Sequence, residues 1–283
     1  MARLPSSGAL AELLTAARTA YDIPPDAGLC AAPGTQTIMQ ALPDMVGPAD
    51  IAVISPTYGE HAHIWRQSGY SVSEIASLDR IGDARIVVIV NPNNPDGRLT
   101  KPGRLDDVRA DLAAKGGLLI VDEAFADVAP DISLASRTAR EGLLVLRSFG
   151  KFFGLAGIRL GFAAGHGDLI QTLAARLGPW AVSGPAIEIG TRALTDSDWI
   201  MQTRAALARS RERLDRILLS HGFPLVGGTE LYRLVQCDES HACFQRLAEA
   251  GVLVREFPDR PGWLRFGLPG SDADFDRLDR SLD

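Results

Sequence analysis

The sequence has few cysteines, no long apolar run and no stripe of basic residues. Its three cysteines, Cys30, Cys237 and Cys243, form no CxxC pair and are widely spaced. This argues against a disulfide framework and predicts a reducing, cytoplasmic location. No apolar run approaches the roughly 20 residues of a membrane span, and "MARLPSSGAL" lacks the apolar core of a signal peptide. The 29 basic and 35 acidic residues are interspersed without a basic stripe, so neither a membrane nor a nucleic acid is an expected partner.

Motifs for metal ions and nucleotides are also missing. The five histidines show neither HExxH nor Cys/His spacing, so no metal site is expected. Neither GxGxxG nor GxxxxGK[ST] follows the first strand pattern, which weakens the interpretation as a plain nucleotide-binding domain. His61 is close to Tyr58 in the sequence. A contact with a substrate phosphate is therefore an alternative to a position on a helix surface.

What the sequence does have is an alternation of short apolar runs with helical patterns. Strand patterns occur at residues 51–55, 85–90, 117–122 and 143–148 of the 283-residue chain. Such runs, apolar on both sides and interleaved with helices, are typical of a mostly parallel sheet. We therefore predict an α/β fold whose large domain, residues 1–190, is a mostly parallel sheet sandwiched by helices.

The last third of the chain has a different pattern. Residues 184–220 predict one long helix. It is followed by a strand, a helix, two strands and a terminal helix, in "LYRLVQ", "HACFQRLAEAG", "VLVRE", "WLRFGL" and "DADFDRLDRSL". This order predicts a small C-terminal α+β domain over residues 191–283, with the domain boundary inside the long helix.

Chemically useful side chains follow several of the predicted strands, where open α/β sheets bind their ligands. They are Asn91, Asn93 and Asn94 in "NPNNPDG", Asp122 and Glu123 in "VDEAF", and Ser148 and Lys151 in "RSFGKFFGLAGIRLGF". Lys151 stands among small and aromatic residues, which leaves open both a functional amine and a side chain that extends to solvent. In "PGTQTIM", Gly34 precedes a helix start that suits a phosphate group.

A series of motifs in order carries a resemblance to a known family. They are "PGTQTIM", "PTYGEH", "NPNNPDG", "VDEAF", "SFGKFFGLAGIRLG" and "WLRFG", and they extend over residues 30–267. The chain resembles the fold-type I enzymes that use pyridoxal 5'-phosphate, the aspartate aminotransferase superfamily. The resemblance implies a PLP-dependent transferase-like fold and a homodimer.

The resemblance also implies roles for individual residues. Lys151 matches the lysine that forms the Schiff base with the cofactor, and for this role we expect partial burial beside other cationic groups to lower the pKa of its amine. Asp122 matches the carboxylate that pairs with the pyridine nitrogen. Arg265 matches the arginine that binds the substrate carboxylate. The other cofactor-binding residues that it implies are Gly34, Thr35, Gln36, Ser148 and Arg159 at the phosphate, Asn94 at the ring hydroxyl, and Tyr58 on the ring face.

Two departures from the family pattern bear on activity. Phe125 stands where aminotransferases commonly have a tyrosine, so one hydrogen bond to the ring oxygen is lost. Family members also begin with a leader that carries an "NxNP"-type segment, and we expect that leader to be missing before "MARLPSSGAL". The sequence therefore leaves open a truncated, inactive PLP-binding relic.

Within the superfamily, the chain resembles the decarboxylases that act on L-threonine O-3-phosphate in cobalamin biosynthesis. Phe125, "FFGLAGIRLGF" and "GPWAVSGPA" carry this resemblance. It implies a small phosphorylated amino-acid substrate and (R)-1-amino-2-propanol O-2-phosphate as the product. The histidinol-phosphate aminotransferases are the alternative, because decarboxylation and transamination use the same residues.

Overall fold

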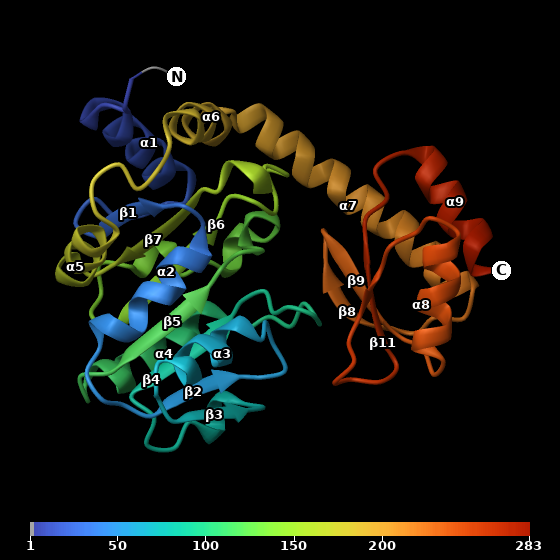
Figure 1. Cartoon of the computed structure of the whole chain (residues 1–283), viewed down its shortest axis with the longest axis horizontal. Coiled ribbons are helices and arrows are strands. Elements are labelled where there is room, and N and C mark those ends of the chain that lie inside the picture. The colour runs from blue at the N-terminus through green and yellow to red at the C-terminus, as the bar shows by residue number, and fades with distance from the viewer. Residues whose placement is uncertain (1–2) are drawn as a thin grey trace. The chain divides into compact units, whose positions relative to one another are not determined.

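The computed structural model describes residues 3–283, and the chain divides into two compact units (Figure 1). The first unit comprises the residues up to Asn93 together with Leu99–Ser197. The second comprises Asn94–Arg98 and Asp198–Asp283. The loop "NPNNPDG" is therefore divided between the units, since its last four residues and Arg98 belong with the C-terminal residues.

The first unit is built on a sheet whose strand order, within residues 3–283, is β1-β7-β6-β5-β4-β2-β3. Its strands are β1 (Gly28–Ala32), β2 (Ile51–Ile54), β3 (Val72–Ile75), β4 (Ile86–Val90), β5 (Leu118–Asp122), β6 (Leu143–Ser148) and β7 (Gly161–Gly165). The strands from β3 to β6 pair in parallel, whereas β7 is antiparallel to both β6 and β1. The predicted α/β class with a mostly parallel sheet is confirmed.

Helices cover both faces of this sheet (Figure 1). The helices of the first unit are α1 (Ser7–Ala20), α2 (Thr35–Ala41), α3 (Glu60–Gln67), α4 (Pro102–Ala113), α5 (Gly167–Leu177) and α6 (Gly184–Thr195). Ile120 and Leu146 pack with α2, α3 and α5, whereas Val121 and Val145 pack with α4. Side chains alternate between the two faces along a strand. The contacts of these four residues therefore show which face of the sheet each following residue of β5 and β6 occupies.

Three strands of this sheet, β1, β3 and β7, were not predicted, and two of them are made of small residues. β1 reads "GLCAA" and β7 reads "GFAAG", and alanine and glycine carry little strand propensity. The small side chains permit close packing. A Cβ atom on Gly28 would lie 2.7 Å from the Cβ atom of Ile170 in α5.

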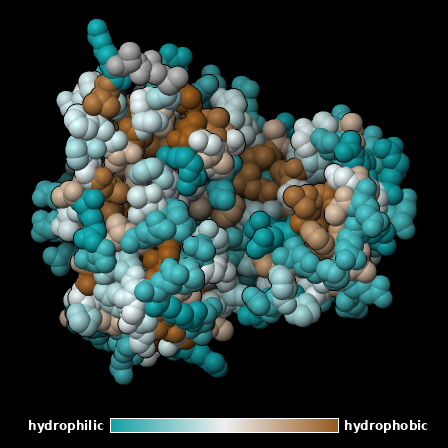
Figure 2. Space-filling model, viewed as in Figure 1, coloured by the Kyte–Doolittle hydropathy of each residue, from teal (hydrophilic) through white to brown (hydrophobic). Residues whose placement is uncertain are grey.

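The second unit contains a sheet with the strand order β10-β11-β9-β8 among the residues described. Its elements are α7 (Ser197–Ser220), β8 (Leu225–Thr229), β9 (Tyr232–Gln236), α8 (Ser240–Glu249), β10 (Arg255–Glu256), β11 (Trp263–Gly267) and α9 (Asp272–Leu282). All its strand pairs are antiparallel. Phe275, Leu278 and Leu282 of α9 turn into its core, and the outer surface around α8 and α9 is mostly hydrophilic (Figure 2). A small α+β unit of this kind is what the sequence pattern predicted.

The single helix predicted over residues 184–220 is wrong. The structure has two helices, α6 and α7, which are separated at Asp196. Asp196 has φ −84° and ψ 74°, outside the helical region. The local sequence "TDSD" explains the break, because short polar side chains favour helix ends over helix interiors. No helix within residues 3–283 has the length and apolar character needed to cross a membrane.

Candidate active site

Asp122, the last residue of β5, is bonded to a buried histidine. One carboxylate oxygen of Asp122 lies 2.9 Å from Nε2 of His61, and the other accepts the backbone N–H of Ala124 at 3.0 Å. The side chains are only 2% (His61) and 6% (Asp122) exposed. Asp122 continues the face of Ile120, which is the face that α3 covers. The carboxylate of Asp122 therefore lies against α3, the helix that carries His61.

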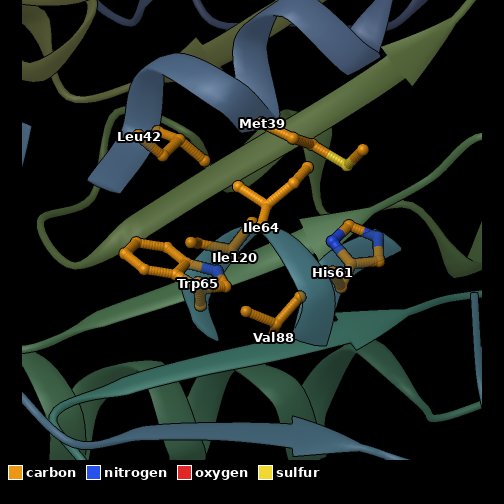
Figure 3. Close-up of a pocket in the computed structure, with 7 residues that line it drawn as sticks. All are labelled: Met39, Leu42, His61, Ile64, Trp65, Val88 and Ile120. Atoms are coloured by element: carbon orange, nitrogen blue, oxygen red, sulfur yellow. The ribbon is translucent and has the colours of Figure 1, made fainter. Parts of the chain in front are cut away.

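Apolar side chains surround His61. Figure 3 shows the imidazole beside side chains from α2, α3, β4 and β5 and from the turn after α2; they are Met39, Leu42, Ile64, Trp65, Val88 and Ile120. A polar pair in such surroundings interacts more strongly than it would in water. The expectation of a helix-surface position for His61 is wrong, because the residue is buried; the contact with a substrate phosphate stays a prediction. No local signal shows the bond to Asp122, because it depends on how α3 packs on the sheet.

Tyr58 stands beside this pair. Its ring centre lies 6.0 Å from that of His61, with the planes at 88°, and 42% of the residue is exposed. Partial burial, and then the nearby Glu60 and Asp122, raise the pKa of its hydroxyl. Asn93 holds the loop that carries Tyr58, because it donates to the Pro56 carbonyl at 2.9 Å and accepts from Thr57 at 2.7 Å. An exposed ring on a braced loop can stack on a flat ligand.

Four of the predicted phosphate-binding residues come together around Gly161. Ser148 pairs with Gly161 across β6 and β7. A Cβ atom on Gly161 would lie 2.6 Å from the backbone nitrogen of Thr35, so the start of α2 rests on this glycine. A Cβ atom on Gly34 would in turn lie 2.6 Å from the Arg159 guanidinium. Backbone N–H groups, a hydroxyl and a guanidinium thus converge, which suits a phosphate group.

Gln36 differs from the other predicted phosphate ligands. Its side-chain amide donates to Glu60 at 3.0 Å, which ties α2 to α3. What Gln36 offers to a phosphate is therefore its backbone N–H in the first turn of α2. Gly34, at the N-cap with φ +83°, supplies no side-chain cap that would compete for these N–H groups.

Gly161→Ala tests the packing of α2 on β7. We expect the added methyl group to push the start of α2 away and to lower the free energy of unfolding by about 1–3 kcal/mol, the usual cost of overpacking. We also expect it to weaken the binding of a phosphorylated ligand at the start of α2. The control is Gly167→Ala, because a Cβ atom on Gly167 meets nothing within 4 Å. Equal phosphate affinity in the two variants would show that the start of α2 binds no phosphate.

Lys151 follows β6, beside the loop that follows β5. Its Nζ lies 5.6 Å from the centre of the Phe125 ring. The expectation that Lys151 is partly buried is wrong, because the residue is exposed and only Phe149, Phe152 and Phe153 around it are buried. Phe125, three residues after Asp122, places the lysine on the same side of the molecule as the end of β5.

Arg265 and Asn94 come together in the second unit. An N–H of the Arg265 guanidinium donates to Oδ1 of Asn94. The guanidinium carbon lies 4.9 Å from the centre of the buried Tyr232 ring. Burial lowers the pKa of Arg265, and among residues 3–283 no carboxylate forms an ion pair with it. A half-buried cation with a neutral partner is suited to an anionic ligand.

The sequence prediction missed a second arginine near Arg265. Arg255 of β10 is the direct partner of Arg265 in β11, so both side chains lie on one face of the sheet. The charge of Arg255 also contributes to the lowered pKa of Arg265. The sequence did hold a signal for it. "VLVRE" and "WLRFG" are consecutive predicted strands, and each contains one arginine.

The family is established by comparison with known proteins. The family model for aminotransferase class I and II matches residues 6–282. The chain belongs to this family, which confirms the predicted superfamily, fold class and enzyme class.

Individual relatives are more specific. The chain is 45% identical over 252 residues to a threonine-phosphate decarboxylase of Pseudomonas aeruginosa, a match that covers 88% of this chain and 76% of the relative. It is 31% identical over 237 residues to a histidinol-phosphate aminotransferase of Aeromonas salmonicida, covering 76% and 65% of the two chains. A solved histidinol-phosphate aminotransferase of Sinorhizobium meliloti, in complex with pyridoxal-5'-phosphate, has the same fold, with a TM-score of 0.87, 21% identity and coverage of 99% and 82%.

Proposed function

We propose that the protein is a pyridoxal phosphate-dependent decarboxylase that converts L-threonine O-3-phosphate into (R)-1-amino-2-propanol O-2-phosphate and CO2, a reaction of cobalamin biosynthesis. The observation that carries the proposal is the 45% identity to a threonine-phosphate decarboxylase over 88% of the chain. The buried pair of Asp122 and His61 and the residues around Gly161 support the cofactor.

The residues present fit pyridoxal phosphate. Asp122 is a buried carboxylate with two hydrogen bonds, and a carboxylate has acceptor sites for about four, so it can also accept a ring N–H. Thr35, Ser148 and Arg159 would hold the phosphate, and Lys151 would hold the cofactor covalently through its ε-amine. Tyr58 would lie on the ring face. The bound cofactor supplies an electron sink for the pair of electrons left at Cα when a substituent departs.

The residues of the chain supply orientation and proton transfer. Asp122 holds a proton on the ring nitrogen, and His61 fixes the orientation of that carboxylate. Arg265 binds the substrate carboxylate and Arg255 the substrate phosphate. When CO2 has left, the amine of Lys151 donates a proton to Cα, where the carboxylate had been. The product therefore keeps the amino group and the phosphate of the substrate.

The choice between decarboxylation and transamination would depend on how Arg265 and the substrate-phosphate site orient the bound amino acid. The relatives include histidinol-phosphate aminotransferases, so transamination is the second candidate. Phe125 favours the decarboxylase, since aminotransferases commonly have a tyrosine there.

A direct assay separates the two reactions. Protein loaded with the cofactor is supplied with L-threonine O-3-phosphate, and CO2 release is measured beside amino transfer from histidinol phosphate to 2-oxoglutarate. The proposal expects CO2 release without amino transfer. Amino transfer without CO2 release would contradict the decarboxylase proposal and support the aminotransferase function.

The two arginines should have separable effects. We expect Arg265→Leu to raise KM about 10- to 100-fold for both L-threonine O-3-phosphate and unphosphorylated L-threonine, since a charge-assisted contact is lost. Arg255→Leu should raise KM only for L-threonine O-3-phosphate. The preference for this substrate over unphosphorylated L-threonine should therefore fall about tenfold. Arg260→Leu is the control, because it removes an arginine of the same unit that has no proposed role at the substrate. The guanidinium carbon of Arg260 lies 5.8 Å from the centre of the Trp263 ring. An unchanged preference in Arg255→Leu would remove Arg255 from the substrate site.

Assembly and location are further parts of the proposal. We propose a homodimer, as in the superfamily that the chain resembles, and light scattering of the purified protein tests it by mass. We propose a cytoplasmic location, which the three free cysteines support.

A further inference from the structure

A cluster of buried charges lies on the face of the sheet opposite to Asp122. Glu123 and Arg147 continue the faces of Val121 and Val145, which pack with α4. Their chain neighbours Asp122 and Ser148 continue the other face, which α2 and α3 cover. The two charged residues thus lie directly behind two residues of the proposed cofactor site.

Arg147 is the centre of this cluster. Its guanidinium donates to Glu123 Oε2 at 2.9 Å and to Asp127 Oδ1 at 2.8 Å. Its carbon also lies 4.2 Å from the centre of the Tyr21 ring. Glu123 in turn accepts the Ser133 hydroxyl at 2.5 Å and the Leu134 N–H at 2.6 Å. Arg147 therefore ties β6 to Glu123 and Asp127, and Glu123 extends the connection to Ser133 and Leu134.

The burial of this cluster makes it rigid. Glu123 is 0% exposed and Arg147 is 4% exposed. Burial raises the pKa of Glu123. Burial would lower the pKa of Arg147, but Asp127 and Glu123 outweigh it and raise that pKa. A buried ion pair resists the loss of one partner, because the remaining charge is left in an apolar setting.

We propose that Arg147 is a positioning residue for the cofactor site. By joining the carboxyl ends of β5 and β6 from behind, it fixes the backbone from which Asp122 and Ser148 project. This inference rests on the proposed function, because it concerns the site that would bind pyridoxal phosphate. A wholly structural ion cluster would stabilise the fold without affecting how the phosphate is held.

The test compares Arg147→Met with a variant at the other end of the same strand. Arg109 of α4 donates to Asp106 at 2.7 Å and to the Glu141 carbonyl at 2.9 Å, just before β6 begins. Arg109→Met therefore breaks a largely buried ion pair at the amino end of β6, away from the site. For each protein, urea unfolding gives the stability, and titration gives Kd for pyridoxal phosphate and for pyridoxal, which lacks the phosphate.

The ratio of the two Kd values reports on the phosphate contacts. In Arg147→Met we expect the preference for pyridoxal phosphate over pyridoxal to fall about tenfold, because the Ser148 contact is disturbed. In Arg109→Met the preference should stay within twofold, even where the loss of stability is the same. Equal preferences in the two variants would overturn the inference and leave the cluster a structural one.

Glu123→Gln keeps the test decisive if Arg147→Met does not fold. Glutamine has the shape of glutamate and still accepts one hydrogen bond, so we expect a smaller fall in the preference in the same direction. An unchanged preference in Glu123→Gln would contradict the inference. Wild-type protein that binds no pyridoxal phosphate would contradict the proposed function itself, whereas normal wild-type binding with unchanged variants would contradict only the role of Arg147.

Discussion

Lys151→Ala should lower the rate of CO2 release from L-threonine O-3-phosphate by about 10³-fold or more. The variant loses the amine that holds the cofactor and the group that returns a proton to Cα, and a positioned proton donor alone contributes about 10²- to 10⁴-fold. The fold should persist, since Lys151 is exposed and its removal opens no buried cavity. Steady-state kinetics with excess pyridoxal phosphate measure the effect.

A matched lysine gives the control for this experiment. The chain has three lysines, Lys101, Lys115 and Lys151, and Lys115 is also exposed. Lys115→Ala should keep the wild-type rate. If Lys151→Ala released CO2 at a rate near that of Lys115→Ala, another group would have to transfer the proton.

Asp122→Asn should be the second most damaging substitution. An amide keeps the shape of the carboxylate but not the negative charge that holds a proton on the ring nitrogen. We expect kcat to fall about 10²- to 10³-fold, the usual effect of removing one preorganised electrostatic contact. His61→Ala should also lower kcat, but by less, because His61 acts by orienting Asp122. Its Nε2 lies 2.9 Å from the Asp122 carboxylate.

The control for Asp122→Asn is an ion-paired carboxylate elsewhere in the same unit. Asp106 bonds Arg109, Arg137 and Arg140, and these arginines lower its pKa despite partial burial. Asp106→Asn should lower stability and leave kcat unchanged. Equal kcat losses in Asp122→Asn and Asp106→Asn would mean that Asp122 acts only through the fold.

The sequence predicted best those parts that depend on local pattern. The strands β2, β4, β5 and β6 are rich in valine, isoleucine and leucine and were all predicted. The strands β1, β3 and β7 were not predicted. The alanines and glycines of β1 and β7 allow α5 and α2 to approach closely, and no local pattern shows that approach. The break at Asp196 was missed for the opposite reason, since apolar periodicity on both sides hid a local helix end.

The candidate site was predicted largely through the family resemblance. The structure brings Gly34, Thr35, Ser148 and Arg159 together, and it joins Asn94 to Arg265. The bond between His61 and Asp122 connects residues 61 positions apart and depends on how α3 packs on the sheet. The assignment of Asn94–Arg98 to the second unit likewise depends on backbone contacts, since a Cβ atom on Gly97 would lie 1.9 Å from the Gly228 carbonyl oxygen.

The most direct test of the account locates the covalent attachment of the cofactor. Protein loaded with pyridoxal phosphate is reduced with borohydride, which makes the attachment stable, and its peptides are analysed by mass spectrometry. We predict that the label is on Lys151 alone among the three lysines. A label on Lys101 or Lys115, or protein that takes up no label, would contradict the central claim.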